Sequence, residues 1–479
     1  MLVQTQKYLT TSLAVIVVTI LAGCGQSGFD SEFATSEHTQ SLIREAQTGV
    51  GELPGVTDLV DERFGTPQDL QAWTRLPIDF GGTTGRVASA PDASAAVKEL
   101  TLEFDEGTSI DFDPQKTLEI QFITGAAAPL TAVVSSWSAE NRVASLTTAL
   151  EAAPAAGDVI VLNGGEPLQH GRVLYMRHCA HCHGTTGDGQ GPTAEYLVPR
   201  PRDYRHGVFK FTSTTAQDKA SRDDLQRVLR NGVPGTYMPS FVPMLNETEL
   251  HDVVEYVRFL TMRGEFERRM VNELAADYSR QAVETRKSGG ESYNDIVKEL
   301  KGFLESDLAD SLEFVSDDLV TAWTNADTPD AVIVPTMARV PDSPDSRRRG
   351  RELYLSSAIN CADCHGIAAE GNGPQTTIFE KNPVTQQLYK EPGLHDVWDH
   401  VNQPRNLRRG IYRGGRRPID LFCRIQAGIK GSRMPSFKNL PHEDIWHIVN
   451  YVLSIPFEPE PGHGPTPSVS PAAEAAASL

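Results

Sequence analysis

Alternating apolar and polar positions predict a small β-rich segment over residues 95–165. Apolar side chains occupy every second position in the runs 100–104 and 118–122, and residues 159–162 are apolar throughout. Clusters of Gly, Pro and Asp separate these runs, as turns between strands require. The pattern leaves open whether this segment docks a partner or only separates its neighbours.

Most of the remaining chain carries helical periodicity. In the runs 250–257 and 445–452, apolar residues recur three and four positions apart, which is typical of a helix packed on a partner. Residues 263–325 are polar and charged with helical spacing, and a linker lies between Pro341 and Asp345, so that connector and linker together occupy residues 263–345. We therefore predict a mainly α protein with one β-rich segment and a helical connector.

The two ends of the chain have compositions of their own. Residues 1–24 contain one Lys, then an apolar core, then small residues up to Cys24, which is the layout of a secretory signal. Residues 25–94 predict a tether and an irregular segment. Residues 459–479 are rich in Pro, Ala and Ser and predict a disordered tail.

The ending Leu-Ala-Gly-Cys resembles a bacterial lipoprotein box. This resemblance implies that Cys24 is lipidated and anchors the protein to a membrane by acyl chains, on the periplasmic side. An ordinary signal peptide, or a buried helix with an incidental Cys, are the alternatives. The sequence does not indicate whether the membrane is the inner or the outer one.

Composition narrows the range of partners. The 479 residues are enough for about three domains, and 44 basic against 63 acidic residues give a formal charge of −19. Such an acidic surface repels phosphate backbones, which argues against nucleic acid, and it favours a basic protein partner. Six cysteines are too few for a disulfide scaffold.

Two copies of Cys-x-x-Cys-His carry the chemistry. The first holds Cys179, Cys182 and His183, and the second holds Cys361, Cys364 and His365. This spacing is typical of c-type heme attachment, because two thiols on one helical turn reach both vinyl groups while the adjacent His supplies an axial nitrogen. A zinc site or an exported disulfide are the alternatives.

The similarity of the two segments extends well beyond the motifs. Gly-Arg-x-Leu-Tyr precedes each motif, Gly-x-Gly-Pro follows it, and Pro-Arg-x-x-Arg-x-Gly comes later in both. The sequence from Asp224 to Phe241 then matches that from Asp420 to Phe437. The chain therefore contains an internal duplication of one heme-binding unit.

Each unit resembles a class I cytochrome c domain, and the pair resembles the diheme members of that family. The resemblance covers residues 166–262 and 346–458. It implies a small helical bundle around each of two covalently bound heme c groups. It also carries the distal-ligand role to Met238 and Met434, which stand at the same place in the two repeats. A neutral, soft thioether favours ferrous iron and raises the reduction potential.

Further roles follow from the same resemblance. Pro192 and Pro374 match the family proline whose carbonyl accepts the proton of the axial His ring. Arg202 and Arg405 occupy matched positions and are candidates for pairing with heme propionates, with a solvated surface charge as the alternative. Cys423 belongs to no shared motif and is predicted to be a buried free thiol.

Several residues compete for the distal position. Met244 and His206 lie in the first unit, but neither has a counterpart of its own type in the second. The second unit has 14 more residues between its first Cys and its Met, around residues 380–400. This loop contains His395 and His400, and it either covers the second heme, forms a docking surface, or supplies a His in place of Met434.

The sequence thus favours a membrane-anchored diheme cytochrome that transfers single electrons between redox partners, one of them basic. Two six-coordinate hemes leave no open iron for a substrate. The alternative is an enzyme resembling the diheme cytochrome c peroxidases, which needs one heme that opens to peroxide. A subunit of a respiratory complex is a third hypothesis, which differs from the first in partner only.

Overall fold

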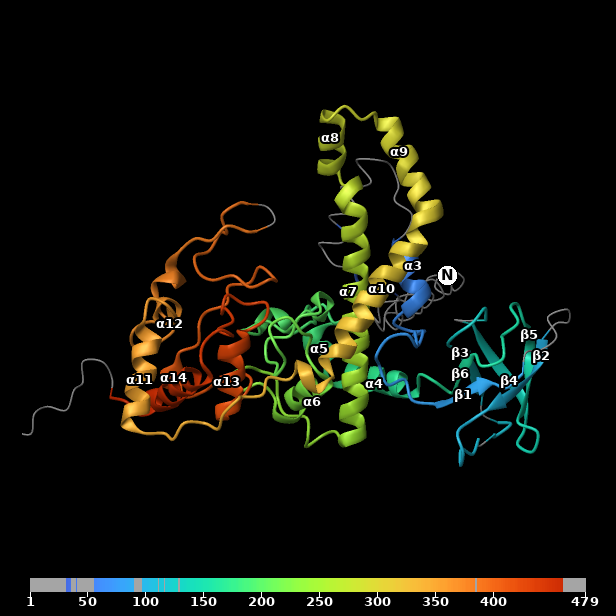
Figure 1. Ribbon diagram of the computed structural model, residues 1–479, viewed down its shortest axis with the longest axis horizontal. Coiled ribbons are helices and arrows are strands. Elements are labelled where there is room, and N and C mark those ends of the chain that lie inside the picture. Colours follow the sequence, from blue (N-terminus) through green and yellow to red (C-terminus); the bar gives the residue numbers. More distant parts are fainter. Residues whose placement is uncertain are drawn as a thin grey trace, which may run out of the picture.

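The computed structural model describes residues 32–35, 40, 56–89, 97–110, 112–115, 117–127, 130–383 and 386–459. A β-barrel, a helical domain with a long helical hairpin, and a second helical domain follow one another along it (Figure 1). The predicted signal segment, Cys24 and the tail beyond residue 459 lie outside these ranges. No helix within them is long and apolar enough to cross a membrane.

The β-rich segment is a closed antiparallel barrel. Its strands, β1 (Thr83–Val87), β2 (Val97–Glu103), β3 (Leu118–Phe122), β4 (Thr131–Ser138), β5 (Val143–Leu150) and β6 (Val159–Leu162), are arranged in the order β1-β2-β5-β4-β3-β6. β1 pairs with β6, which closes the sheet. Alternate residues such as Leu100, Leu102, Ile120 and Phe122 fill the interior, as the period-two pattern predicts.

The barrel starts earlier than the sequence pattern indicates. β1 begins at Thr83, ahead of the expected start at residue 95. Its inward position Gly85 carries no side chain because the ring of Phe104 fills that space, so only Val87 signals the buried face. The prediction of an irregular segment is therefore wrong for this strand.

The segment before the barrel is also more than a tether. Helix α3 (Val56–Phe64) buries Val60 and Phe64 in the core of the first helical domain. The ring of Phe64 lies 5.3 Å from Trp73 and 5.4 Å from Phe259, both edge-on. The four apolar residues of this nine-residue helix, Val56, Leu59, Val60 and Phe64, form too short a periodic run to be recognised in the sequence.

The two helical domains have the same order of helices. The first contains α4 (Glu166–His178), α5 (Ala180–His183), α6 (Arg222–Asn231) and α7 (Glu247–Tyr278). The second contains α11 (Pro344–Leu355), α12 (Cys361–His365), α13 (Pro418–Ala427) and α14 (His442–Ser454). Between them, α8 (Arg280–Ser288), α9 (Tyr293–Gly302) and α10 (Leu308–Ala326) complete a hairpin that projects from the body (Figure 1).

The predicted boundary between the first domain and its connector falls inside a helix. α7 runs unbroken through residue 262, and Phe266, Met270 and Leu274 are buried in the same core as Tyr175. The helical connector is present, but its first turns belong to the first domain. The sequence pattern missed this because buried charged residues interrupt the apolar stripe of α7.

Those buried charges have partners on neighbouring segments. The Arg258 side chain is fully buried, donates to the Pro77 carbonyl over 2.8 Å and pairs at 3.0 Å with Asp327, the C-cap of α10. Arg263 pairs with Asp61 of α3 at 3.0 Å. Because a buried charge is tolerated only when it is paired, α7 fixes α10 and the N-terminal arm, residues 56–82 before the barrel, against the first domain.

In both domains the first and last helices cross at a glycine. A Cβ atom at Gly171 of α4 would overlap the carbonyl oxygen of Asp252 on α7, and one at Gly350 of α11 would overlap that of His447 on α14. The helix backbones therefore touch at these two points. This crossing places α5 and α12, which carry the Cys-x-x-Cys-His motifs, in equivalent positions.

Gly350→Ala is expected to lower the free energy of unfolding by about 3 kcal/mol, because the new methyl group meets a helix backbone that cannot move aside. Gly302→Ala is the matched control, since no described atom lies within 4 Å of a Cβ there. It should leave stability unchanged or raise it by under about 1 kcal/mol. Urea denaturation followed by circular dichroism measures both, and equal losses would contradict the backbone contact.

Candidate heme-attachment sites

Each Cys-x-x-Cys-His motif lies on a helix of little more than one turn. Cys179 follows the last residue of α4 and is the N-cap of α5, which places Cys182 and His183 on the next turn. α12 carries the whole second motif. Gly184 and Gly366, at φ of 76° and 79°, end these helices in a conformation that favours glycine.

The four motif thiols are free in the structure. Burial raises the pKa of Cys179 and of Cys361 to about 12. Within the described ranges, no group of three or more His, Cys, Asp or Glu side chains could hold a metal ion.

Each axial imidazole is oriented by a backbone carbonyl. His183 Nδ1 lies 3.1 Å from the carbonyl oxygen of Arg202, and His365 Nδ1 lies 3.0 Å from that of Arg405. A carbonyl only accepts, so Nδ1 carries the proton and the lone pair of Nε2 is left for a metal. Burial lowers the pKa of both rings, that of His183 to about 4, and thus keeps them neutral.

The prediction that Pro192 and Pro374 supply these carbonyls is wrong. After Pro192 the chain forms a 3-10 turn, Ala194–Tyr196. The acceptor Arg202 lies ten residues beyond Pro192, and in the second domain the acceptor Arg405 lies 31 residues beyond Pro374, after the turn Pro374–Thr377. In each domain a matched proline lies near the glycine loop and another lies near the true acceptor. Their positions in the sequence do not show which of the two segments supplies the acceptor carbonyl.

Glycines allow the returning segment to come this close. Gly189 (φ 72°) would carry a Cβ only 2.8 Å from the carbonyl oxygen of Pro201. Gly371 (φ 80°) lies against the carbonyl of Pro404 in the same way. Any side chain at these positions would push the segment away from the imidazole, so the Gly-x-Gly-Pro sequence is needed for the hydrogen bond.

The two methionine loops have the same hydrogen bonds. The Val233 amide donates to the Met238 carbonyl over 3.0 Å, and that of Ile429 donates to the Met434 carbonyl over 3.1 Å. Hydroxyls two residues earlier accept from the methionine amides, Thr236 at 3.1 Å and Ser432 at 3.2 Å. Each methionine packs against the core of its own domain, so its position is fixed by backbone contacts.

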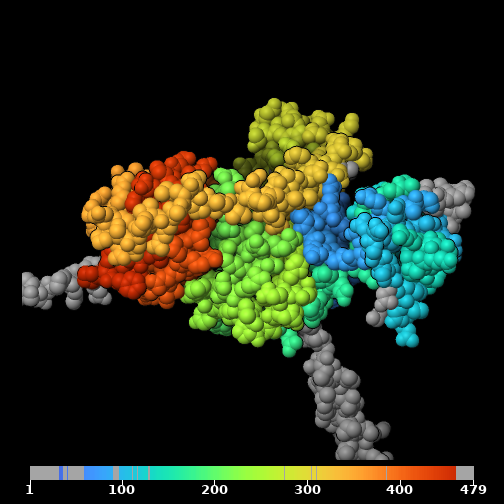
Figure 2. All heavy atoms as spheres, turned by 60° about the horizontal axis from the view of Figure 1, so that its bottom comes forward, coloured from blue at the N-terminus to red at the C-terminus, as the bar shows by residue number. Residues whose placement is uncertain are grey.

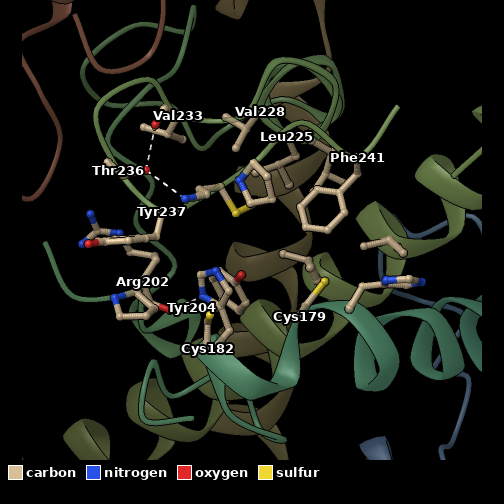
Figure 3. A pocket seen from close by; sticks show the side chains of 18 of the residues that line it. Cys179, Cys182, Arg202, Tyr204, Leu225, Val228, Val233, Thr236, Tyr237 and Phe241 are labelled. Carbon is tan, nitrogen blue, oxygen red and sulfur yellow. Dashed lines mark hydrogen bonds between the residues drawn. The ribbon is translucent and has the colours of Figure 1, made fainter. Parts of the chain in front are cut away.

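In the first domain these groups surround a cavity of about 400 Å³. Both thiols, His183 and Met238 line it, and most of the wall is apolar. Figure 3 shows Cys179 and Cys182 on one side and Leu225 and Phe241 on the other. A mostly apolar cavity with two thiols and a neutral imidazole fits a covalently attached heme.

Other candidates for the distal position have different surroundings. Met244 also lines the cavity, but half of it is exposed. His206 lies against the ring of Trp398, 5.5 Å between centroids. His395 is buried, stacks on Tyr389 at 3.7 Å and has Nδ1 3.0 Å from the Gly393 carbonyl. Both of these contacts of His395 are with residues of its own loop.

The loop around 380–400 packs against the first domain. Asp396 pairs with Lys210 at 2.8 Å, and Trp398 Nε1 donates to the Asp203 carbonyl over 3.2 Å. Burial lowers the pKa of His400, which lies near the basic residues of this contact. The loop therefore joins the two domains, a role that the sequence did not indicate.

The two matched arginines differ in their surroundings. Arg202 lines the cavity of the first domain, and burial lowers its pKa to about 10. Arg405 is half-buried and its Nε donates to the Ile411 carbonyl over 2.9 Å. Their pairing with heme propionates stays a prediction. Cys423 is buried and free, as expected.

Sequence reasoning missed a pair of tyrosines. The hydroxyl of Tyr175 donates to the Gly184 carbonyl over 2.8 Å, and that of Tyr354 donates to the Gly366 carbonyl over 2.7 Å. Both bonds are buried and fix the turn directly after the axial His. The in-register Gly-Arg-x-Leu-Tyr sequences were the available signal, although they did not reveal this contact.

Two family models match the two domains that carry these sites. Residues 166–257 match the family model described as cytochrome c oxidase, cbb3-type, subunit III, and residues 348–456 match the model for cytochrome c. No curated protein matches the chain. A solved structure, the reducing HAO-like protein complex of Kuenenia stuttgartiensis, is 20% identical over 60% of this chain and 96% of that one, with a TM-score of 0.41.

Tyr175→Phe and Tyr354→Phe are each expected to lower the free energy of unfolding by about 1–2 kcal/mol, because a buried carbonyl loses its donor. The two sites lie in different domains, so the losses should add in the double variant. Denaturant titration of the three variants measures this. A double variant no less stable than the singles would contradict independent, equivalent roles.

Proposed function

From its membership among the c-type cytochromes with two cytochrome c domains, we propose that this protein holds one covalent heme c in each domain and passes single electrons between protein partners. The observation that carries the proposal is the duplication of the full frame of hydrogen bonds. The carbonyl on the axial imidazole, the tyrosine on the following turn and the methionine loop recur in both domains.

A bound heme c would supply a reversible one-electron couple at its iron. The chain's own residues do the rest. The four motif thiols provide the covalent attachment, and the neutral imidazoles of His183 and His365 offer Nε2 as proximal ligand. Met238 and Met434 are the proposed distal ligands, which close both irons to water and substrate and favour a carrier over a peroxidase.

The proposal extends to place and partner. The apolar N-terminal run that ends at Cys24 supports export and a lipid anchor on the periplasmic side of a bacterial membrane. The formal charge of −19 supports a basic redox partner that is drawn in by long-range attraction. A respiratory complex that contains this protein as its electron-transfer subunit fits the same charge and the same chemistry.

The number of hemes is tested by mass. The full-length protein should carry two covalent hemes, and replacing Cys179 and Cys182 by Ser should remove one of them and leave the other. Replacing Cys361 and Cys364 should remove the second. Cys423→Ser is the control, because this buried thiol lies outside both motifs, and it should keep both hemes. A wild type with fewer than two hemes contradicts the proposal.

The distal ligands are tested with carbon monoxide. The reduced wild type should bind none, whereas Met238→Ala should bind one molecule per protein, because removing the thioether opens one iron. Met244→Ala is the matched control on the same cavity wall and should behave as the wild type. Optical titration measures both. Ready binding by the wild type would favour the peroxidase alternative, and opening by Met244→Ala would reassign the ligand.

A further inference from the structure

The two heme domains meet through equivalent residues. Gly235 and Gly431 occupy the same position in the two methionine loops. A Cβ at Gly235 would lie 3.0 Å from Ile411 of the second domain, and one at Gly431 would lie 3.0 Å from Val208 of the first. Val208 and Ile411 are themselves counterparts in the duplicated sequence. The interface is therefore approximately two-fold symmetric, and Figure 2 shows the two domains in direct contact.

One side of this interface breaks the symmetry. The guanidinium of Arg405 lies directly against Gly235, with Nη2 2.5 Å from the position of a Cβ. Its counterpart Arg202 stacks instead on the indole of Trp398, and that indole lies 2.8 Å from the position of a Cβ at Gly431. The Arg202 Cζ atom lies 3.7 Å from the centroid of the Trp398 ring. Trp398 belongs to the loop that only the second unit has.

Trp398 is held in place by contacts with both domains. Its Nε1 donates to the Asp203 carbonyl over 3.2 Å, and its amide donates to Asp396 over 3.1 Å. Asp396 in turn forms its 2.8 Å ion pair with Lys210, and both side chains are nearly fully buried. Arg202 and Lys210 also line the cavity of the first domain. The second domain thus supports one wall of the first heme cavity.

This wall is cationic and shielded from solvent. Burial lowers the pKa of Lys210 to about 8, and the charge of Arg202 contributes in the same direction. The nearby Arg413 is half-buried, and its Nε has no hydrogen-bond partner among the residues that the structure describes. Arg202 and Lys210 on this wall face the carboxylate of Asp396, and the carboxylate of Asp203 also acts on Arg202. A fixed positive charge beside a heme disfavours the oxidised iron, and water excluded by an indole cannot screen that charge.

Resting on the proposed function, we propose that Trp398 is a positioning residue that holds Arg202 against the first heme cavity and thereby raises the reduction potential of the first heme alone. The stacked indole restrains the guanidinium by a cation–π contact and keeps water from its outer face. The equivalent arginine of the second domain, Arg405, lies against Gly235 and has no indole beside it within the described part of the chain. The inserted loop therefore makes two otherwise equivalent hemes unequal.

The test is a redox titration of the full-length protein and of Trp398→Leu, with each heme assigned by the single-heme cysteine variants. Trp398→Leu should lower the ratio of reduced to oxidised first heme about tenfold at fixed poise, which is 59 mV for one electron. The second heme should not move. Trp398→Phe keeps the aromatic face and should retain most of the wild-type value. Tyr389→Phe, in the same loop, is the matched control and should change neither heme.

A double variant shows whether Trp398 acts through Arg202. In an Arg202→Gln background, Trp398→Leu should produce no further shift. Equal shifts of both hemes, no shift in Trp398→Leu, or an undiminished shift in the Arg202→Gln background would each overturn the inference. Heme content by mass separates this failure from that of the proposed function. A wild type with two hemes whose potentials ignore Trp398 refutes the positioning role only, whereas a wild type without two hemes refutes the proposed function.

Discussion

The hydrogen bond between the imidazole of each Cys-x-x-Cys-His motif and a backbone carbonyl is the constraint on which both cytochrome c domains depend. It fixes which ring nitrogen keeps the proton, and so which one is available to a metal. The carbonyl belongs to a segment about twenty residues beyond the first His and forty beyond the second. That segment reaches the ring because Gly189 and Gly371 have no side chains to hold it off. Attachment motif, glycine loop and returning segment therefore form one unit.

Much of this arrangement is predictable from the sequence, because the duplication lets each motif be checked against its counterpart in the other domain. Paired Cys-x-x-Cys-His motifs and methionines in register point to the heme sites, and the structure places Cys179, Cys182, His183 and Met238 around one cavity. The helix-packing glycines lie in the matched Gly-Arg-x-Leu-Tyr sequences. Such local features survive in the sequence because each needs a particular residue type at a particular spacing.

Other features depend on contacts between distant segments, which a single sequence does not reveal. The sequence predicts the carbonyl acceptor at Pro192 and the structure has it at Arg202. Every residue has a backbone carbonyl, so the residue type does not show which carbonyl accepts the hydrogen bond. The β1 strand was missed because Gly85 gives its inward space to Phe104. The loop with Trp398 showed only as extra length, and its partner Arg202 lies nearly two hundred residues away. The buried, paired charges of α7 were not recognised either, because in the sequence they look like part of an exposed polar stretch.

The unbroken course of α7 determines how the chain divides into cooperative units. At 1.5 Å per residue its 32 residues extend about 48 Å, from the first heme core to the base of the hairpin. A fragment that stopped at residue 262 would strip Phe266 and Met270 from that core and leave Arg222 and Arg258 without Asp327. The hairpin and the N-terminal arm are thus internal scaffolding of the first heme domain. The barrel, which has a core of its own, is the piece that could be removed without opening that domain.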